Sequence, residues 1–130
     1  MADANHLKKI CLIDGLGAAS SAFGMAVVTV LPQEWFGLPK FATLLLSLVA
    51  IGFAINSLRC WKAQPAPLGR SLVQIGTLNL SYCTAALILA LIYRSELQPI
   101  MVAYLAFEGL IIVPLSIYEI KLGLQSASAI

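Results

Sequence analysis

Long apolar runs separated by short polar segments dominate the chain. About 20 helical residues span a hydrocarbon core of roughly 30 Å, and four of the runs approach or exceed that length. We expect membrane-spanning helices at residues 10–31, 41–58, 71–93 and 100–120. The connecting segments are too short for anything except joining antiparallel neighbours. The sequence therefore predicts an all-α fold, a single transmembrane domain over residues 1–130 that forms a four-helix bundle with up-down-up-down topology.

The last apolar run carries a carboxylate, Glu108, near its middle. On insertion scales a central acid costs roughly 2.5 to 3.5 kcal/mol, whereas each Leu, Ile, Val or Phe returns about 0.3 to 0.6 kcal/mol. The eleven such residues from Ile100 to Ile120 return on the order of 5 kcal/mol, so the segment inserts with its acid. A membrane helix with a buried acid needs protein neighbours to face, which favours a bundle.

Polar positions within the runs are predicted to share the inner face of this bundle. In the last helix Tyr104, Glu108 and Glu119 follow a helical spacing that places them on one face. We expect Asn79 beside Glu108 near mid-membrane, with Asp14, Asn56, Gln74 and Glu119 closer to the cytoplasmic ends of their helices. The candidate polar or proton-binding site comprises Glu108, Asn79, Asp14, Glu119, Tyr104 and Gln74.

Two interpretations of these residues stay open. A structural Glu108 would be protonated and hydrogen-bonded to Asn79, Tyr82 or a backbone carbonyl, whereas a functional Glu108 would bind a proton or a cation. Asp14 and Glu119 lie near enough to the interface to form ion pairs or to reach water. The basic residues available for such pairs are Arg59, Arg70 and Lys121. Asn79 is expected to join helices by hydrogen bonding rather than to bind a ligand.

Small residues dominate the first apolar run, where Gly17 and Ser21 are four positions apart. Small residues at this spacing let helix backbones approach closely in lipid. We expect Gly17 and Ser21 at a helix–helix contact inside the bundle, with a homodimer seam as the alternative.

Composition supports the membrane class and excludes several kinds of chemistry. Hydrophobic residues make up 60% of the chain and charged residues 11%, against roughly 25% charged residues in soluble domains. His6 is the only histidine and lies outside the apolar runs, which excludes bis-histidine haem ligation and leaves a zinc site without ligands. The cysteines Cys11, Cys60 and Cys83 lack C-x-x-C spacing. We therefore expect no metal, no cofactor, no catalytic residue and no nucleic-acid partner, and the sequence leans against an enzyme.

Basic residues are distributed unevenly between the two ends of the predicted bundle. One end holds six of them, Lys8, Lys9, Arg59, Lys62, Arg70 and Lys121. The other end holds two, Lys40 and Arg94. Short loops rich in Lys and Arg stay in the cytoplasm, so we expect both termini there and the protein in the cell inner membrane.

Three segments of the chain resemble a family of small uncharacterised bacterial four-helix inner-membrane proteins. They read LIDGLGAASSAFG, QIGTLNLSY and LAFEGLIIVPLSIYEIKLGL. In that family the first helix carries an aspartate near its start, which corresponds to Asp14. The third helix carries an asparagine before an aromatic residue, which corresponds to Asn79 and Tyr82, and the fourth ends in a glutamate, which corresponds to Glu119. The resemblance implies the four-helix fold and the inner membrane, and it carries no activity.

Two functions follow from this interpretation. The first is a non-catalytic binding or accessory membrane component, which agrees with the lack of a recognisable set of catalytic residues in the sequence. The alternative is a small, dimeric proton-coupled transporter or channel that uses Glu108 as its titrating site. The expected partners are the lipid bilayer and a second copy of the chain or a larger membrane complex.

Overall fold

The computed structural model describes residues 4–63 and 68–128 of the 130-residue chain. The described residues form four long α-helices, in the order that the apolar runs predict, and one short 3-10 helix. The elements are α1 (Ala4–Val30), η1 (Gln33–Trp35), α2 (Lys40–Ala63), α3 (Leu68–Ile92) and α4 (Pro99–Ser128). All four long helices are long and apolar enough to cross a membrane, which confirms the all-helical fold class.

Several helices extend beyond the apolar runs that predicted them. The first begins at Ala4, the second continues to Ala63 and the last continues to Ser128. Lys and Arg, as at Lys8 and Arg59, are good helix formers, so backbone hydrogen bonding continues where the apolar pattern stops. The apolar run marks the part of a helix suited to lipid and not the end of the helix.

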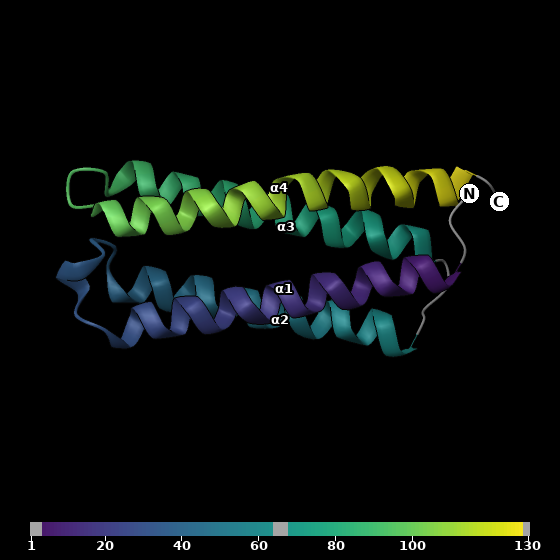
Figure 1. The fold of residues 1–130 in the computed structure, drawn as a ribbon, viewed down its shortest axis with the longest axis horizontal. Helices are drawn as coiled ribbons and strands as arrows, with labels where there is room; N and C mark the ends of the chain where they lie inside the picture. The colour runs from purple at the N-terminus through teal and green to yellow at the C-terminus, as the bar shows by residue number, and fades with distance from the viewer. Residues whose placement is uncertain (1–3, 64–67, 129–130) are drawn as a thin grey trace.

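The helices associate as two hairpins, α1 beside α2 and α3 beside α4 (Figure 1). Four side-chain hydrogen-bond contacts join α1 to α2 along most of their length. They pair Cys11 with Cys60, Asp14 with Ser57, Ala22 with Ser47 and Thr29 with Thr43. As the residue number increases along α1, the number of its partner in α2 decreases by a similar amount, so the two helices run antiparallel in one fixed register.

Glycines allow the helices of each hairpin to approach closely. A Cβ atom added at Gly76 in α3 would lie 2.7 Å from the carbonyl oxygen of Ser116 in α4. A Cβ atom added at Gly15 in α1 would lie 2.8 Å from Cδ2 of Leu58 in α2. The contact at Gly76 is with a backbone atom that cannot move aside, so this position needs glycine at the present helix separation, whereas the contact at Gly15 is with the end of a leucine side chain, which can shift.

Gly17 takes no part in this close approach. An added Cβ atom at the exposed Gly17 would meet no atom within 4 Å, although Ser21 is buried as expected. The close contacts of α1 are instead made by Gly15 and by Gly24, which lies against the phenol of Tyr104. The prediction that Gly17 packs at a helix–helix contact is therefore wrong, because α1 turns a different set of small residues inward.

The segment between α1 and α2 contacts the turn between α3 and α4. The backbone N–H of Gln98 donates to the carbonyl of Phe36 over 3.0 Å. Gly37 has a φ of 92°, in the left-handed region, and a Cβ atom there would collide with the carbonyl of Glu96. Glycine is thus the residue that lets the two hairpins touch at this end.

At the opposite end α1 begins close to where α4 ends (Figure 1). The phenol of Tyr118 and Nε2 of His6 are hydrogen-bonded at 2.9 Å. The two hairpins are therefore connected at both ends of the molecule.

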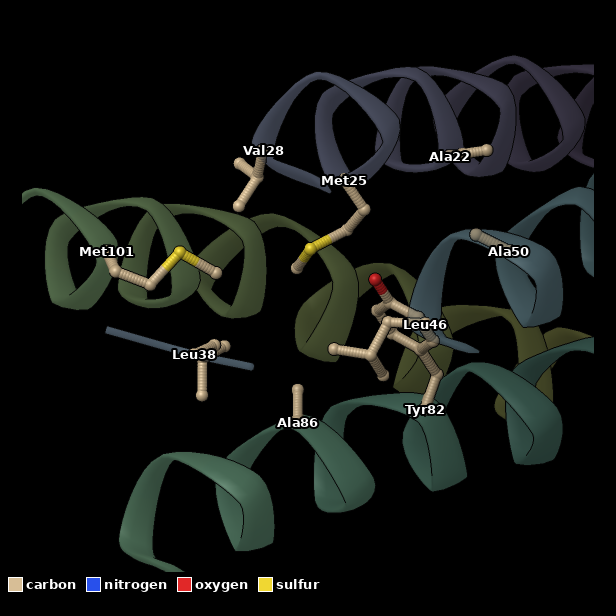
Figure 2. Close-up of a cluster of buried hydrophobic side chains, with 9 residues drawn as sticks. All are labelled: Ala22, Met25, Val28, Leu38, Leu46, Ala50, Tyr82, Ala86 and Met101. Atoms are coloured by element: carbon tan, nitrogen blue, oxygen red, sulfur yellow. The ribbon is translucent and has the colours of Figure 1, made fainter. Parts of the chain in front are cut away.

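Between these ends, a buried apolar cluster joins both hairpins (Figure 2). Its members are Ala22, Met25, Val28, Leu38, Leu46, Ala50, Tyr82, Ala86 and Met101. Many other large apolar side chains point outward, among them Phe23, Phe41 and Leu110. Water would solvate such a surface poorly, whereas lipid chains suit it.

Candidate functional site

A cavity of about 370 Å³ lies between α1 and α4, with α2 and α3 contributing to its walls. This volume falls within the range of roughly 300 to 1,000 Å³ that small-molecule sites occupy. The polar residues that line the cavity are Asp14, Ser20, Ser21, Asn79, Tyr82, Tyr104 and Glu108. The rest of the lining is apolar or aromatic, and none of the lining residues is basic.

The carboxyl group of Glu108 lies where three of the helices meet. It is close to the hydroxyl groups of Ser21 from α1, Tyr82 from α3 and Tyr104 from α4. The hydroxyl of Tyr82 is buried and makes no hydrogen bond within the described residues. Figure 2 shows that Tyr82 reaches from α3 into the middle of the bundle. The cavity thus presents a half-buried acid together with an unused hydroxyl donor.

Four aromatic rings line the cavity that holds this acid. Phe53 of α2 and Tyr82 of α3 meet edge to face, with ring centroids 6.3 Å apart. Tyr104 and Phe107 of α4 line the same cavity. Sequence reasoning missed this arrangement, because two of the four rings belong to other helices and show no spacing relation to Glu108 along the chain.

The second acid of the cavity, Asp14, is only 3% exposed and is bonded by neutral donors. The hydroxyl of Ser57 on α2 donates to its Oδ2 over 2.6 Å. The amide Nδ2 of Asn79 on α3 donates to its Oδ1. Asn79 thus lines the same cavity as Glu108, as predicted, but its amide bonds to Asp14 and joins α3 to α1, and within the described residues it makes no hydrogen bond to Glu108. The expectation that Asn79 connects helices is met by a different partner.

Glu119 on α4 is fully buried, at 0% exposure, and lies close to Asp14. Neither of its carboxyl oxygens has a hydrogen-bond partner in the described part of the chain, and the same is true of the hydroxyl of Ser116 one turn away. Glu119 does not line the cavity itself, but it is a second buried acid beside Asp14, which does.

Among the described residues, the ion pairs expected for these acids do not form. Arg59, Arg70 and Lys121 are all exposed, and Asp14 is bonded by neutral groups instead. Arg59 points outward because its neighbours Ser57 and Cys60 occupy the buried face of α2. The ion-pair prediction for Asp14 and Glu119 is therefore wrong.

No protein-family model, curated protein or solved structure matches this chain. The chemistry of the cavity must therefore be judged on its own residues. Within residues 4–63 and 68–128, no group of three or more His, Cys, Asp or Glu side chains could hold a metal ion. What the cavity offers is two acids, aromatic rings and hydroxyl groups in an apolar setting.

Of the remaining site candidates, Tyr104 joins the cavity and Gln74 does not. Tyr104 lines the cavity beside Glu108. Gln74 is exposed, because the buried face of α3 passes through Leu72, Ile75 and Asn79 instead. The prediction that Gln74 lies on the inner face of the bundle with the other polar residues is wrong.

A pair of thiols also meets in the bundle. Sγ of Cys11 in α1 lies 3.1 Å from Sγ of Cys60 in α2. The two residues are far apart in the sequence, so a search for short cysteine motifs does not find them. The signal that would have found them is the register of an antiparallel α1–α2 hairpin, in which residues near the start of α1 face residues near the end of α2.

Proposed function

We propose that this protein is a non-catalytic membrane binding protein whose cavity takes a lipophilic organic cation. The observation that carries the proposal is the cavity lining, in which Glu108 is accompanied by the rings of Phe53, Tyr82, Tyr104 and Phe107 and by no basic side chain. A carboxylate in this setting lacks a counter-charge from the protein, and a bound cation supplies one.

The expected interaction energies favour a cation over other ligands. A carboxylate and a cation 4 Å apart attract by about 4 kcal/mol at an effective dielectric constant of about 20. Each aromatic face adds roughly 0.5 to 2 kcal/mol through cation–π attraction. An anion of the same shape would lose both contributions.

The outer edge of the cavity supports entry from the lipid phase. Gly17 and Ser20 of α1 and Phe107 and Ile111 of α4 line the cavity and are exposed on the outer surface. A ligand that reaches this edge from a membrane must be soluble in lipid, which favours an organic cation with apolar groups over a hydrated metal ion.

Calorimetric titration of the protein in lipid nanodiscs tests the proposal, with phenyltrimethylammonium as the ligand and empty nanodiscs as the blank. We expect binding of the cation, and much weaker binding of its neutral isostere tert-butylbenzene. Glu108→Gln should weaken binding of the cation by about tenfold or more, or about 1.4 kcal/mol. Glu96→Gln removes an acid from the exposed turn before α4 and should leave binding unchanged. Equal binding of the two ligands, or equal effects of the two variants, would contradict the proposal.

The second candidate function is a small, dimeric proton-coupled transporter or channel. Its support is that Asp14 lines the same cavity as Glu108, so two acids lie along one path. In this version Glu108 exchanges a proton for the cation. Proteoliposomes loaded with a pH-sensitive dye distinguish the two candidates: cation uptake with counterflow of protons favours transport, whereas binding without uptake favours the first proposal.

The proposed arrangement in the membrane is up-down-up-down, in the cell inner membrane, with both termini in the cytoplasm. This orientation is supported by the basic residues, because six of the eight are predicted at the end of the bundle that holds the termini, and such residues stay in the cytoplasm. The resemblance to small bacterial four-helix inner-membrane proteins also supports it. The lipid bilayer is one partner, and a second copy of the chain or a larger membrane complex is the other that we propose.

A further inference from the structure

The contact between Cys11 and Cys60 is close enough to become a covalent bond. Their sulfur atoms are 3.1 Å apart, and the bond length of a disulfide is about 2.0 Å. Closing the bond therefore requires the two sulfur atoms to approach by only about 1 Å. Both residues are free thiols in the structure.

The register of the α1–α2 hairpin keeps the two thiols together. One turn away, the hydroxyl of Ser57 donates to Asp14 over 2.6 Å. Gly15 lies against Leu58 in the same region and lets the two backbones approach closely. The thiol pair thus sits beside two independent contacts that fix the same register, and a slide of one helix along the other would break all three.

The surroundings of the pair determine which reactants reach it. Cys11 is 0% exposed and Cys60 is 4% exposed. Both belong to an apolar cluster that also contains Leu72 of α3 and Leu122 of α4. Water-soluble oxidants enter such a cluster poorly. A reactant must be soluble in lipid and must accept two electrons together with two protons, which is the chemistry of a quinone.

We propose that Cys11 and Cys60 form a redox-active pair that a lipid-soluble quinone oxidises to a reversible disulfide joining α1 to α2. Two S–H bonds break and one S–S bond forms. The two electrons and two protons pass to the quinone, whose two carbonyl oxygens become the hydroxyl groups of a quinol. A small dithiol reductant reverses the step by thiol–disulfide exchange.

The position of the pair gives this reaction a consequence for the cavity. Cys11 lies three residues before Asp14, and Cys60 lies three residues after Ser57. A disulfide would fix α1 against α2 directly beside the Asp14–Ser57 hydrogen bond. Oxidation of the thiol pair would thereby restrict the movement of Asp14, an acid that lines the cavity. This inference does not depend on which ligand the cavity binds.

The experiment counts free thiols by maleimide labelling and mass spectrometry after denaturation. The reduced full-length protein in lipid nanodiscs is treated with decylubiquinone, and a parallel sample with diamide, an uncharged azo oxidant that permeates membranes. We expect the wild type to fall from three reactive thiols to one in both samples and to lose two hydrogen atoms in mass. Treatment with dithiothreitol should restore all three.

Single-cysteine substitutions provide matched controls. Cys83 lies on α3, outside the pair, so Cys83→Ser should fall from two reactive thiols to none. Cys11→Ser and Cys60→Ser should each keep their remaining two thiols. The pairing is overturned if the wild type keeps three thiols with both oxidants, if Cys83 takes part, or if thiol loss coincides with a covalent dimer. Oxidation by diamide but not by decylubiquinone overturns the assignment of a quinone.

Discussion

At the scale of single residues, the buried acids differ in how their polar atoms are satisfied. Asp14 accepts hydrogen bonds from Ser57 and Asn79, each on a different helix. Glu119 has no hydrogen-bond partner for either oxygen within the described residues. A bonded acid stabilises the arrangement of its donors, whereas an unbonded one costs free energy. Mutations at the two positions should therefore have opposite consequences.

Asn79→Ala should lower the free energy of unfolding by about 1 to 3 kcal/mol. The substitution removes the donor to Asp14 and leaves a buried carboxyl oxygen unsatisfied. Ser81→Ala is the control, because the exposed Ser81 hydroxyl donates to a carbonyl of its own helix, that of Thr77. Reversible unfolding in mixed detergent micelles measures both. Similar losses in the two variants would show that the Asp14–Asn79 contact contributes nothing.

Glu119→Leu should leave the free energy of unfolding unchanged or raise it. The leucine fills nearly the same volume and removes a buried carboxyl that the described residues leave unpaired. Asp14→Leu should instead destabilise the protein, because it leaves the donors of Ser57 and Asn79 without an acceptor. The same unfolding assay applies. A marked loss of stability in Glu119→Leu would mean that Glu119 forms a stabilising interaction, for example with a bound cation.

The sequence indicates which polar residues are buried better than it indicates their partners. Helical spacing alone places Glu108 and Glu119 on one face, and both are at least partly buried. The pairing of Asn79 with Asp14 depends on how α3 is rotated and shifted against α1. No spacing within one helix encodes this, so sequence spacing places Asn79 beside Glu108 and does not predict the Asp14–Asn79 or the Cys11–Cys60 contact.

At the scale of elements, the apolar runs locate the helices and leave their contact faces undetermined. The first helix is lined with small and apolar residues on every side, so several faces satisfy the small-residue spacing equally. Gly17 and Gly15 are equivalent by that criterion, yet only Gly15 lies against a neighbouring helix. The choice between them is made by the hydrogen bonds of Asp14 and the thiol contact of Cys11, which depend on α2 and α3.

Gly76→Ala should destabilise the bundle by about 1 to 3 kcal/mol. The added methyl group would press against the Ser116 carbonyl and the side chain of Ile120, so α3 and α4 would have to separate. Gly17→Ala and Gly52→Ala are matched controls, since neither position has any atom within 4 Å of the added Cβ. Both controls should be neutral or slightly stabilising in the unfolding assay. An equal loss at Gly17 would contradict the helix faces described above.

At the scale of the whole molecule, the two hairpins meet through the cluster of Figure 2 and through contacts at both ends. The outward surface is largely apolar, which lipid accommodates and water does not. The number of helices and their suitability for a membrane follow from the apolar runs alone. The cavity does not, since its walls come from all four helices and depend on the separation of α1 from α4.

Orientation in the membrane is a separate prediction, which depends on where the basic residues lie. The turn between α3 and α4, which contains Ser95, lies at the opposite end of the molecule from the end of α4, which contains Ser126 (Figure 1). With six basic residues predicted at the end of the termini and two at the other, the positive-inside rule places Ser126 in the cytoplasm.

Impermeant maleimide labelling of intact cells tests this orientation in a background without the native cysteines. We expect Ser95→Cys to react from outside and Ser126→Cys to react only after the membrane is permeabilised. Labelling of both after permeabilisation is the control for reactivity. The reverse pattern in intact cells would place the termini outside, and the six basic residues would then stand on the side that the membrane potential disfavours. Under that outcome Cys11 and Cys60 would also lie near an oxidising compartment, where a persistent disulfide is expected instead of a reversible one.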